Sequence, residues 1–523
     1  LIASTRSVLG PPEMPFAIGE LERDDVTPVV KSRTYQLAAM ANVAAADPYS
    51  RVVSSSGLLT IDGTHFDSAA CITFGERFES VIHDINGDPA FTATWTYDGD
   101  GNWYGASSYW SPSTPDGEDD VAVLPDIITG NTTINLAGAG ISSEGVVVRE
   151  LHFDSASYRY SVQREASTLI PLHFTSSSGL SKIVVSNAVD ARIRGIWVGD
   201  ESVDIILSND LQIDVVDSGG SFLLRAPLIG TDDVIKTGPG EMRWGGDGWA
   251  ITNKAPFFTG NVYVRDGDFD ITEFPFSCNK LVVSNDSGNQ ARVLIYDNPS
   301  FADGVNEIII GENGEFIQRS EDQDLDMTMD GGTYYFGFSA GSYDNAGTIT
   351  FRDTVSQVRL NVGGTEAFFT GRVEGEGTLW KRGNLDLRFV GTISPGNSIG
   401  EFTLDRYTSG DLDIGTASDL VTLEIEVDGA TSDRLIVTNL PSALELSYID
   451  LDVINVQNVT PTMTNTIVTS DSGLSGDFNS IAWPQGYSGT VFTEGNDVKV
   501  TGLVPEPTLL GVLALSALLL RRK

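Results

Sequence analysis

The amino-acid sequence predicts an all-β protein whose short strands stack into a solenoid. Runs of roughly four to eight β-branched and other apolar residues recur from about residue 50 to residue 502, and glycine, asparagine or aspartate bounds each run. The same stretch shows almost no sustained helical period. Glycine, the residue best suited to tight corners, occurs 55 times among 523 residues. Together these observations indicate many strands joined by many turns.

Five runs represent the expected strands in chain order, at residues 145–153, 182–186, 203–206, 280–284 and 307–310. Spacings of roughly 8 to 12 residues between strands are compatible both with sandwich domains and with a solenoid. Internal similarity favours the solenoid, because a repeated unit that cannot bury its own apolar face must stack on its neighbours. Strands would then run in register up each side of the stack, with glycine at the corners.

Two pairs of segments carry the internal similarity. Residues 234–245 and 377–387 each set a lysine and a glycine close together near an alternating strand. The tetrapeptide Phe-Phe-Thr-Gly occurs at residues 257–260 and again at residues 368–371. After the first copy, residues 261–271 have the pattern of a strand, a glycine turn and a second strand.

These segments resemble the autotransporter-associated β-strand repeat of large bacterial surface proteins, which has a Lys-x-Gly-x-Gly strand, a turn and a Thr-Gly step. Residues 394–400, Ser-Pro-Gly-Asn-Ser-Ile-Gly, followed by the strand at 423–429, are similar to the C-terminal part of β-helical passenger proteins. Trp95, Trp103 and Trp110 resemble the N-terminal edge of the same architecture. The resemblance implies a right-handed parallel β-helix.

The predicted organisation has five parts. They are a leader or disordered segment at residues 1–50, a short β segment at 51–90, a β-helix with autotransporter-type repeats at 91–440, a C-terminal β cap at 441–502 and an apolar tail at 503–523. Caps are expected at both ends of the helix, because an uncovered end strand would offer its backbone to other chains.

The tail combines a proline-flanked acid, an uncharged apolar run and a basic end. Its parts, in order, are Val504, Pro505, Glu506 and Pro507, the run at 508–520, and Arg521, Arg522 and Lys523. A helix of about thirteen residues rises only about 20 Å, whereas the hydrocarbon core of a membrane is about 30 Å thick. A short C-terminal hydrophobic helix read by a membrane enzyme is therefore favoured over a permanent anchor, with its cations on the cytoplasmic side.

This tail resembles the PEP-CTERM sorting signal. The resemblance implies recognition by an exosortase-like membrane enzyme, cleavage near the Pro-Glu-Pro sequence, and export to the cell surface or to an exopolysaccharide matrix. The tail would lie in the inner membrane only transiently, and the rest of the chain would end outside the cell.

The net charge of −40 limits the partners of the protein. A chain with 72 acidic and 32 basic residues has no general means of neutralising phosphates, so nucleic acid is excluded as a leading partner. Strong self-repulsion suits a soluble, secreted surface protein. It is also compatible with divalent cations.

The strongest candidates for catalysis are alternating carboxylates. Asp266, Asp268 and Asp270 would share one face of a strand, and residues two apart on such a face are about 6.5–7 Å apart. Glycoside cleavage needs two carboxyl groups roughly 5 to 9.5 Å apart. A solvated face of an acidic protein has the same pattern, so these residues are candidates only if the protein is an enzyme.

Asp98, Asp100 and Asn102 resemble the start of a calcium loop. An EF-hand would need glycine at the sixth position and an acid at the twelfth, where Trp103 and Tyr109 stand. The EF-hand is therefore excluded, and the segment is interpreted as a tight acidic turn, with another kind of calcium site as the alternative.

The leading hypothesis from the sequence is an exported structural or adhesive protein of the cell surface or extracellular matrix, with no catalytic residues and no cofactor other than calcium. Its expected partners are an exosortase-like enzyme and an exopolysaccharide. The alternative is a β-helical polysaccharide hydrolase or lyase.

Overall fold

The computed structural model describes most of the chain after residue 90. The described residues are 91–505 without 105–108, 139–144, 165–169, 188–189, 195–202, 246–256, 273–275, 286–287, 297–300, 319–323, 337–341, 361–365, 385, 397–398 and 408–409, together with 16–19, 39–40, 42–43, 50–53, 71 and 78. The expected apolar helix at 506–520 lies outside the described residues.

One long ladder of parallel strands, here called face A, runs along the molecule. Its strands are β3 (Thr92–Trp95), β6 (Val121–Leu124), β9 (Glu150–Asp154), β12 (Leu180–Ser186), β15 (Asp210–Val215), β18 (Val234–Thr237), β21 (Asn261–Val264), β23 (Cys278–Val283), β25 (Val305–Ile310), β27 (Met327–Met329), the first parts of β30 (Thr348–Leu360) and β32 (Arg372–Arg382), β34 (Thr392–Pro395), β37 (Val421–Asp428), β41 (Ile449–Gln457) and β44 (Ser480–Ala482).

A second parallel ladder, face B, accompanies the first. It contains β4 (Gly101–Tyr104), β7 (Thr132–Gly138), β10 (Tyr160–Arg164), β13 (Ala191–Arg194), β16 (Ser221–Arg225), β19 (Glu241–Gly245), β22 (Gly267–Thr272), β24 (Ala291–Tyr296), β26 (Gly314–Gln318), β28 (Thr333–Phe336), the second parts of β30 and β32, β35 (Glu401–Asp405), β39 (Arg434–Thr438) and β42 (Thr464–Ser470).

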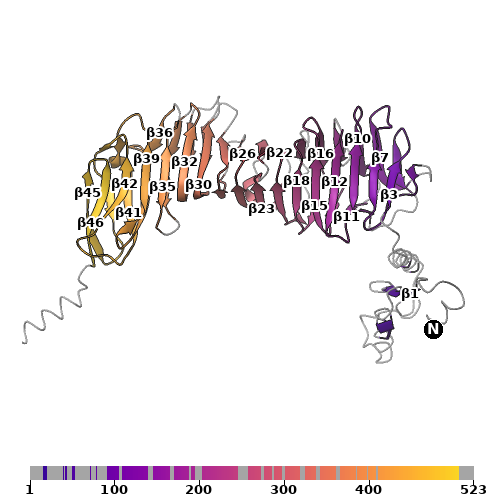
Figure 1. The fold of residues 1–523 in the computed structure, drawn as a ribbon, viewed down its shortest axis with the longest axis horizontal. Coiled ribbons are helices and arrows are strands. Elements are labelled where there is room, and N and C mark those ends of the chain that lie inside the picture. The colour runs from indigo at the N-terminus through magenta and orange to yellow at the C-terminus, as the bar shows by residue number, and fades with distance from the viewer. Residues whose placement is uncertain are drawn as a thin grey trace, which may run out of the picture.

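Two shorter parallel sheets form a third side, face C. The first contains β8 (Val146–Val148), β11 (Leu172–Phe174), β14 (Ile205–Leu207), β17 (Leu228–Gly230) and β20 (Phe257–Phe258); the second contains β29 (Ser342–Asn345), β31 (Glu366–Phe369), β33 (Asp386–Phe389) and β36 (Leu412–Ile414). Figure 1 shows the strands side by side along the long axis of the molecule, in a stack that narrows near β22, β23 and β26.

The chain is all-β, and its large, mostly parallel sheets are consistent with a β-solenoid. Successive strands of one face belong to successive coils; on face A, for example, β9 pairs with β12 and β12 with β15. Sandwich domains are built from antiparallel sheets, so the parallel ladders argue against that alternative.

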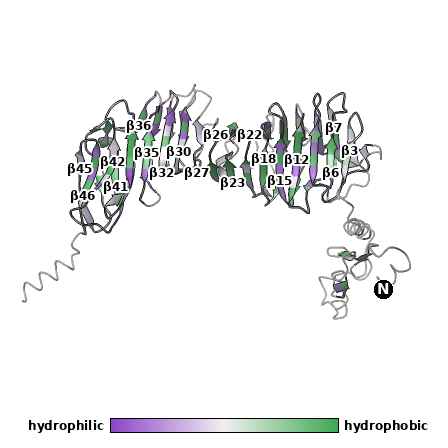
Figure 2. Cartoon of the chain, viewed as in Figure 1, coloured by the Kyte–Doolittle hydropathy of each residue, from purple (hydrophilic) through white to green (hydrophobic). Residues whose placement is uncertain are grey.

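The interior of the stack is one apolar cluster that extends from Ala93 to Leu503. Strand residues alternate between this core and the outside, as in β12, where Ser181, Ile183 and Val185 are buried between half-exposed neighbours. Figure 2 shows the resulting mixture of hydrophobic and hydrophilic residues along the strands. Because one coil cannot enclose a core, each coil depends on the next for burial.

Each expected strand overlaps an observed one, but the run at 145–153 does not form a single strand. It divides into β8 on face C and β9 on face A, with a corner at Arg149. The carbonyl of Asp120 on the preceding coil accepts hydrogen bonds from the N–H groups of both Arg149 and Glu150, at 2.8 and 3.1 Å. The continuous apolar run concealed this corner, since both strands direct alternate residues into the same core.

The two Phe-Phe-Thr-Gly copies occupy equivalent corners. In each, the phenylalanines end a face C strand, β20 or β31, and the glycine precedes a face A strand. A Cβ added to Gly260 would lie 2.1 Å from the carbonyl oxygen of Asp232, and one added to Gly371 would lie 2.1 Å from that of Gly347. Only glycine permits the backbones of adjacent coils to approach so closely.

The lysine–glycine segments share a local contact but lie on different faces. Lys236, on face A, is completely buried, and its Nζ donates hydrogen bonds to the carbonyl oxygens of Thr237, Gly238 and Asp266 at 3.0, 2.6 and 2.8 Å. Lys381, on face B, is equally buried and donates to the carbonyl of Gly383 at 3.1 Å. Burial lowers the pKa of each lysine to about 8.

The two ends of the stack are closed differently. At the first coil, Trp95, Trp103 and Trp110 are buried against one another, with ring centroids 4.8 to 5.2 Å apart between neighbours. At the last coil, β45 (Tyr487–Glu494) and β46 (Asp497–Pro505) form an antiparallel hairpin whose second strand pairs with β42. Antiparallel pairing changes the pattern of backbone groups offered to a further parallel coil.

The described residues before position 91 include one pair of strands. β1 (Phe16–Gly19) and β2 (Ser50–Val53) pair in parallel, and β2 crosses the boundary expected at residue 50. At the other end, β46 crosses the boundary expected at residue 503, and Leu503 is buried in the core. The folded body therefore extends to Val504 and Pro505.

Candidate functional site

The three aspartates predicted to share a strand face are divided by a turn. Asp266 precedes β22, and Gly267 has a φ of +68°, which interrupts the alternation before the strand begins. The carboxylate of Asp266 accepts hydrogen bonds from the N–H of Gly267 at 2.8 Å and from Nδ2 of Asn289 at 3.2 Å. Asp266 therefore belongs to a corner, and only Asp268 and Asp270 project from the outer surface of face B.

Asp268 is engaged by an arginine of the next coil. Its two carboxylate oxygens accept hydrogen bonds from Nε and Nη2 of Arg292 at 2.8 and 2.5 Å. These hydrogen bonds raise the pKa of Arg292. A carboxylate held in such a bidentate pair is a poor nucleophile or base, because its charge and lone pairs are already satisfied.

Asp270 is the most deeply buried of the three. Only 8% of Asp270 is exposed. Its pKa is raised to about 7, mainly by burial and secondly by the negative charge of the neighbouring Glu241. Glu241 lies on β19, one coil earlier, and accepts a hydrogen bond from Arg243 at 2.7 Å. A carboxyl group that titrates near neutrality beside a second carboxylate can donate or accept a proton.

The sequence did not point to Glu241, because it lies outside the Asp266–Asp270 run and reaches the site through strand pairing. Glu241 is directly opposite Asp268, and Arg243 is opposite Asp270. A search for acids at the register positions of neighbouring coils would have found it, but that register depends on the lengths of the intervening loops.

The candidate calcium residues join the first coil to the second. Asp98 accepts hydrogen bonds from the N–H and the hydroxyl of Thr129, both at 2.8 Å, and Asp100 accepts one from the N–H of Thr133 at 2.6 Å. Asn102 accepts a hydrogen bond from Asn135 at 3.4 Å. Throughout the described part of the chain, no group of three or more histidine, cysteine, aspartate or glutamate side chains is arranged to hold a metal ion.

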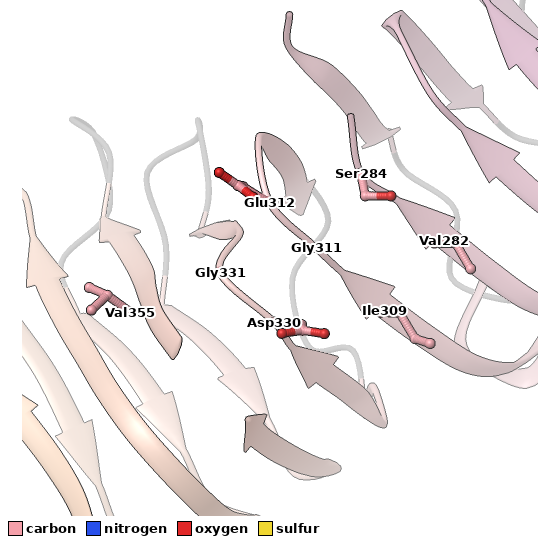
Figure 3. A pocket seen from close by; sticks show the side chains of 8 residues that line it. All are labelled: Val282, Ser284, Ile309, Gly311, Glu312, Asp330, Gly331 and Val355. Carbon is pink, nitrogen blue, oxygen red and sulfur yellow. The ribbon is translucent and has the colours of Figure 1, made fainter. Parts of the chain in front are cut away.

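A pocket of about 620 Å³ opens on the narrow part of the stack (Figure 3). Successive coils line it with Val282, Ser284, Ile309, Gly311, Glu312, Asp330, Gly331 and Val355. Its carboxylates are Glu312 and Asp330, and Asp330 forms an ion pair with Arg352 at 3.0 Å. None of the three predicted aspartates lines this pocket, so it does not complete a catalytic site with them.

The outer surfaces of faces A and B differ in charge. At outward positions of the face A strands, carboxylates greatly outnumber cations: Glu150, Asp154, Asp210, Asp214, Glu307, Glu374, Glu424, Glu426, Asp428, Asp450 and Asp452 against Lys182, Lys280, Arg352 and Arg372. At outward positions of face B, arginines outnumber carboxylates: Arg192, Arg194, Arg225, Arg243, Arg292, Arg359, Arg382 and Arg434 against Glu241, Asp268, Asp270, Glu315, Glu401 and Asp405.

The clustering of cations on one part of face B is reflected in the pKa of Arg194. The pKa of Arg194 is lowered, first by burial and then by the positive charges of Arg159, Arg192 and Arg225. In a chain with a net charge of −40, this face is an exception that the overall composition conceals.

Part of the predicted sorting segment is visible. Val504 and Pro505 belong to β46 and lie opposite Ser488 and Tyr487 of β45. Glu506, Pro507, Arg521, Arg522 and Lys523 lie outside the described residues. In the described portion of the chain, no helix has the length and apolar character required to cross a membrane.

Comparison with known proteins assigns no family to the chain. No protein-family model matches it, and no curated protein or solved structure shows significant similarity to it.

Proposed function

We propose that the protein is an exported, non-catalytic β-helical rod that serves a structural or adhesive role at the cell surface or in an extracellular polysaccharide matrix. The observation that carries this proposal is the single apolar core that joins every coil from Ala93 to Leu503. A stack of this kind transmits load along its axis, because each coil is hydrogen-bonded and packed against the next. The proposal includes a right-handed coil, the hand implied by the passenger-like segments.

The route of export is proposed from the segment at 503–523. Its Pro-Glu-Pro sequence, uncharged run and three cations have the order of a PEP-CTERM signal and suggest recognition by an exosortase-like enzyme in the inner membrane. The short helix expected at 508–520 would lie in that membrane transiently. Since the folded body extends to Pro505, cleavage after this point would release the rod with its hairpin intact.

Cell fractionation combined with mass spectrometry tests this proposal. The full chain, produced in a bacterium with an exosortase-like enzyme, is expected outside the cell without its three terminal cations. A Glu506→Ala variant is expected to remain uncleaved and membrane-associated. Recovery of the unaltered chain from the cytosol, or of surface material that still carries Arg521, Arg522 and Lys523, would contradict the proposal.

A polysaccharide hydrolase is the second candidate, favoured by the burial of Asp270 beside Glu241 and its pKa of about 7. A rod without catalysis releases no reducing ends from purified polysaccharides. The enzyme would be established instead if the wild-type chain released reducing ends, the Asp270→Asn variant released none, and the Asp266→Asn variant still released them.

A further inference from the structure

In the C-terminal half of the stack, face B carries a row of arginine and tyrosine side chains on successive coils. Tyr335 pairs with Arg359, and Arg359 pairs with Arg382 on the following coil. Tyr407, just beyond the end of β35, lies beside Arg382, whose guanidinium carbon is 4.8 Å from the centre of the tyrosine ring. The row therefore has the order Tyr-Arg-Arg-Tyr across four coils, with strands about 4.8 Å apart.

A second row supports the first. Gln357 is opposite Trp380 on the next coil, and the ring of Trp380 stacks on that of Tyr407 at 5.3 Å and an interplanar angle of 19°. The Oε1 of Gln357 accepts hydrogen bonds from Arg359 at 3.2 Å and from Arg382 at 2.9 Å. These contacts hold both guanidinium groups in place, so little side-chain entropy remains to be lost when a ligand binds.

The cations of this row are weakly neutralised. Among the described residues, no carboxylate lies within 4.0 Å of the Arg382 guanidinium, and the closest to Arg359 is Glu315 at 3.9 Å. Elsewhere on face B, Arg292 and Arg434 are paired with carboxylates at 2.5 and 3.1 Å. The exposed fraction of Tyr407 is 52%, so the aromatic end of the row is open to solvent.

We propose that the arginine–aromatic row, formed by Tyr335, Arg359, Arg382, Tyr407, Trp380 and Gln357, binds an acidic polysaccharide laid along the axis of the stack. Guanidinium groups bind carboxylates in a bidentate manner, and aromatic rings accept the apolar C–H faces of sugar rings. A polymer with a carboxylate on successive sugars meets arginines at the regular spacing of the coils. This inference rests on the proposed extracellular function for its choice of ligand.

The remainder of the molecule restricts where such a polymer can bind. Face A presents rows of carboxylates that repel a polyanion, whereas face B presents an excess of arginine. Charge complementarity therefore selects one side of the rod. Binding should weaken as salt rises, because the guanidinium groups are partly exposed and are screened over about 8–10 Å.

Isothermal titration of the purified full chain with polygalacturonate tests the inference, with uncharged dextran in parallel. Polygalacturonate is expected to bind and dextran to show little heat. The Arg382→Gln variant should weaken binding about tenfold, which corresponds to one charge-assisted hydrogen bond. Tyr407→Ala should weaken it less. The matched control is Arg352→Gln, which removes the same charge from face A and should leave the affinity unchanged.

Three outcomes would overturn the inference: equal losses in Arg382→Gln and Arg352→Gln, binding of dextran as tight as that of polygalacturonate, or tighter binding of single-stranded oligothymidylate. Circular dichroism of each variant checks that the fold is retained. A chain that reaches the cell surface but binds no polygalacturonate would refute this site alone. A chain confined to the cytosol would refute the proposed function, whatever it binds in a titration.

Discussion

The coils before β20 and those between β21 and β28 enclose the same core in different ways. The earlier coils have three sides, and their face C strands contribute aliphatic residues such as Leu172 and Ile205, both completely buried. In the later coils, the described residues include no face C strand. Aromatic rings occupy the interior there: Phe276, Phe301, Phe316 and Tyr334 follow one another with centroids 5.7 to 6.0 Å apart. Trp244 of the preceding strand β19 lies 5.1 Å from Phe276.

The number of residues in a coil varies along the stack. Asn187 and Asp154, which are hydrogen-bonded between neighbouring coils in the three-sided region, are 33 residues apart. Asn279 and Asn261, which make the same kind of contact in the narrow region, are 18 residues apart. Other coils overlap in length: Arg372 and Thr392, paired beside the face C strands β31 and β33, are 20 residues apart, and Lys280 and Glu307, paired in the narrow region, are 27 apart. Faces A and B persist through both regions, and in the narrow one large rings fill the interior between the described strands.

The largest effect is expected from removing one of these rings. Phe276→Ala should lower the free energy of unfolding by about 3–5 kcal/mol, because it leaves a cavity among rings that cannot collapse. Phe276 also loses contacts with Trp244 at 5.1 Å and Phe301 at 5.7 Å. Urea unfolding monitored by tryptophan fluorescence measures the loss.

Phe174→Ala is the matched control for the three-sided coils. Phe174 is completely buried on face C. Its truncation should cost less than that of Phe276, since aliphatic neighbours repack more readily around the space. An equal or greater loss at Phe174 would contradict the idea that the stacked rings contribute more to the narrow coils than single rings do to the three-sided ones.

The next effect concerns two buried carboxyl groups, Asp270 in the narrow region and Asp433 nearer the C-terminal end of the stack. Burial raises the pKa of both Asp270 and Asp433 from 3.8 to about 7. Between pH 3.8 and about pH 7, the folded state therefore binds more protons than the unfolded state. The stabilising contribution is complete below pH 3.8 and is lost as the pH rises through 7. Asp270→Asn should therefore raise the free energy of unfolding at pH 8 by on the order of 2 kcal/mol and flatten its dependence on pH.

Asp433→Asn should not share this gain. The two oxygens of Asp433 accept hydrogen bonds from the N–H groups of Gly400 at 3.0 Å and Glu426 at 2.8 Å. An amide supplies only one acceptor oxygen, so one buried N–H would lose its partner. Urea unfolding of both variants at pH 5 and pH 8 measures the change in the free energy of unfolding. Equal changes in the two variants would show that the backbone hydrogen bonds to Asp433 do not affect stability.

The smallest effect is expected at the glycine corners, which both regions share. Gly260→Ala and Gly371→Ala should each cost about 1–3 kcal/mol, because the added methyl group overlaps a carbonyl of the previous coil. Gly130→Ala, where no atom lies within 4 Å of the added Cβ, should be nearly neutral. Thermal unfolding of the three variants provides the measurement, and a loss at Gly130 equal to the others would remove the steric explanation.

Local pattern predicted the strands well where a single face was involved. Residues 182–186 and 307–310 lie within β12 and β25, and 280–284 overlaps β23 except for its last residue, because alternation with one buried side is a local property. The expected strand at 203–206 is observed as β14 (Ile205–Leu207), a small shift. The corner at Arg149 was missed, since a change of face leaves no mark in a run of apolar residues.

The candidate sites were less predictable from the sequence. Asp268 and Asp270 do lie on one strand face, but Asp266 is separated from them by the left-handed conformation of Gly267. Glu241 and Arg292, which set the chemistry of these aspartates, come from other coils. The order Tyr335, Arg359, Arg382 and Tyr407 has no local signature, because each of these four residues is more than twenty positions from the next.

By itself, the sequence determined that this chain forms β-strands with glycine corners, and that a proline-flanked acid, an apolar run and three cations occupy residues 503–523. Those properties depend on backbone preference and on residues adjacent in sequence. Only the tertiary structure decided which residues share a row, which face collects the arginines and where rings fill the interior. These depend on the register between coils, and register is set by loop lengths and by packing of the whole stack.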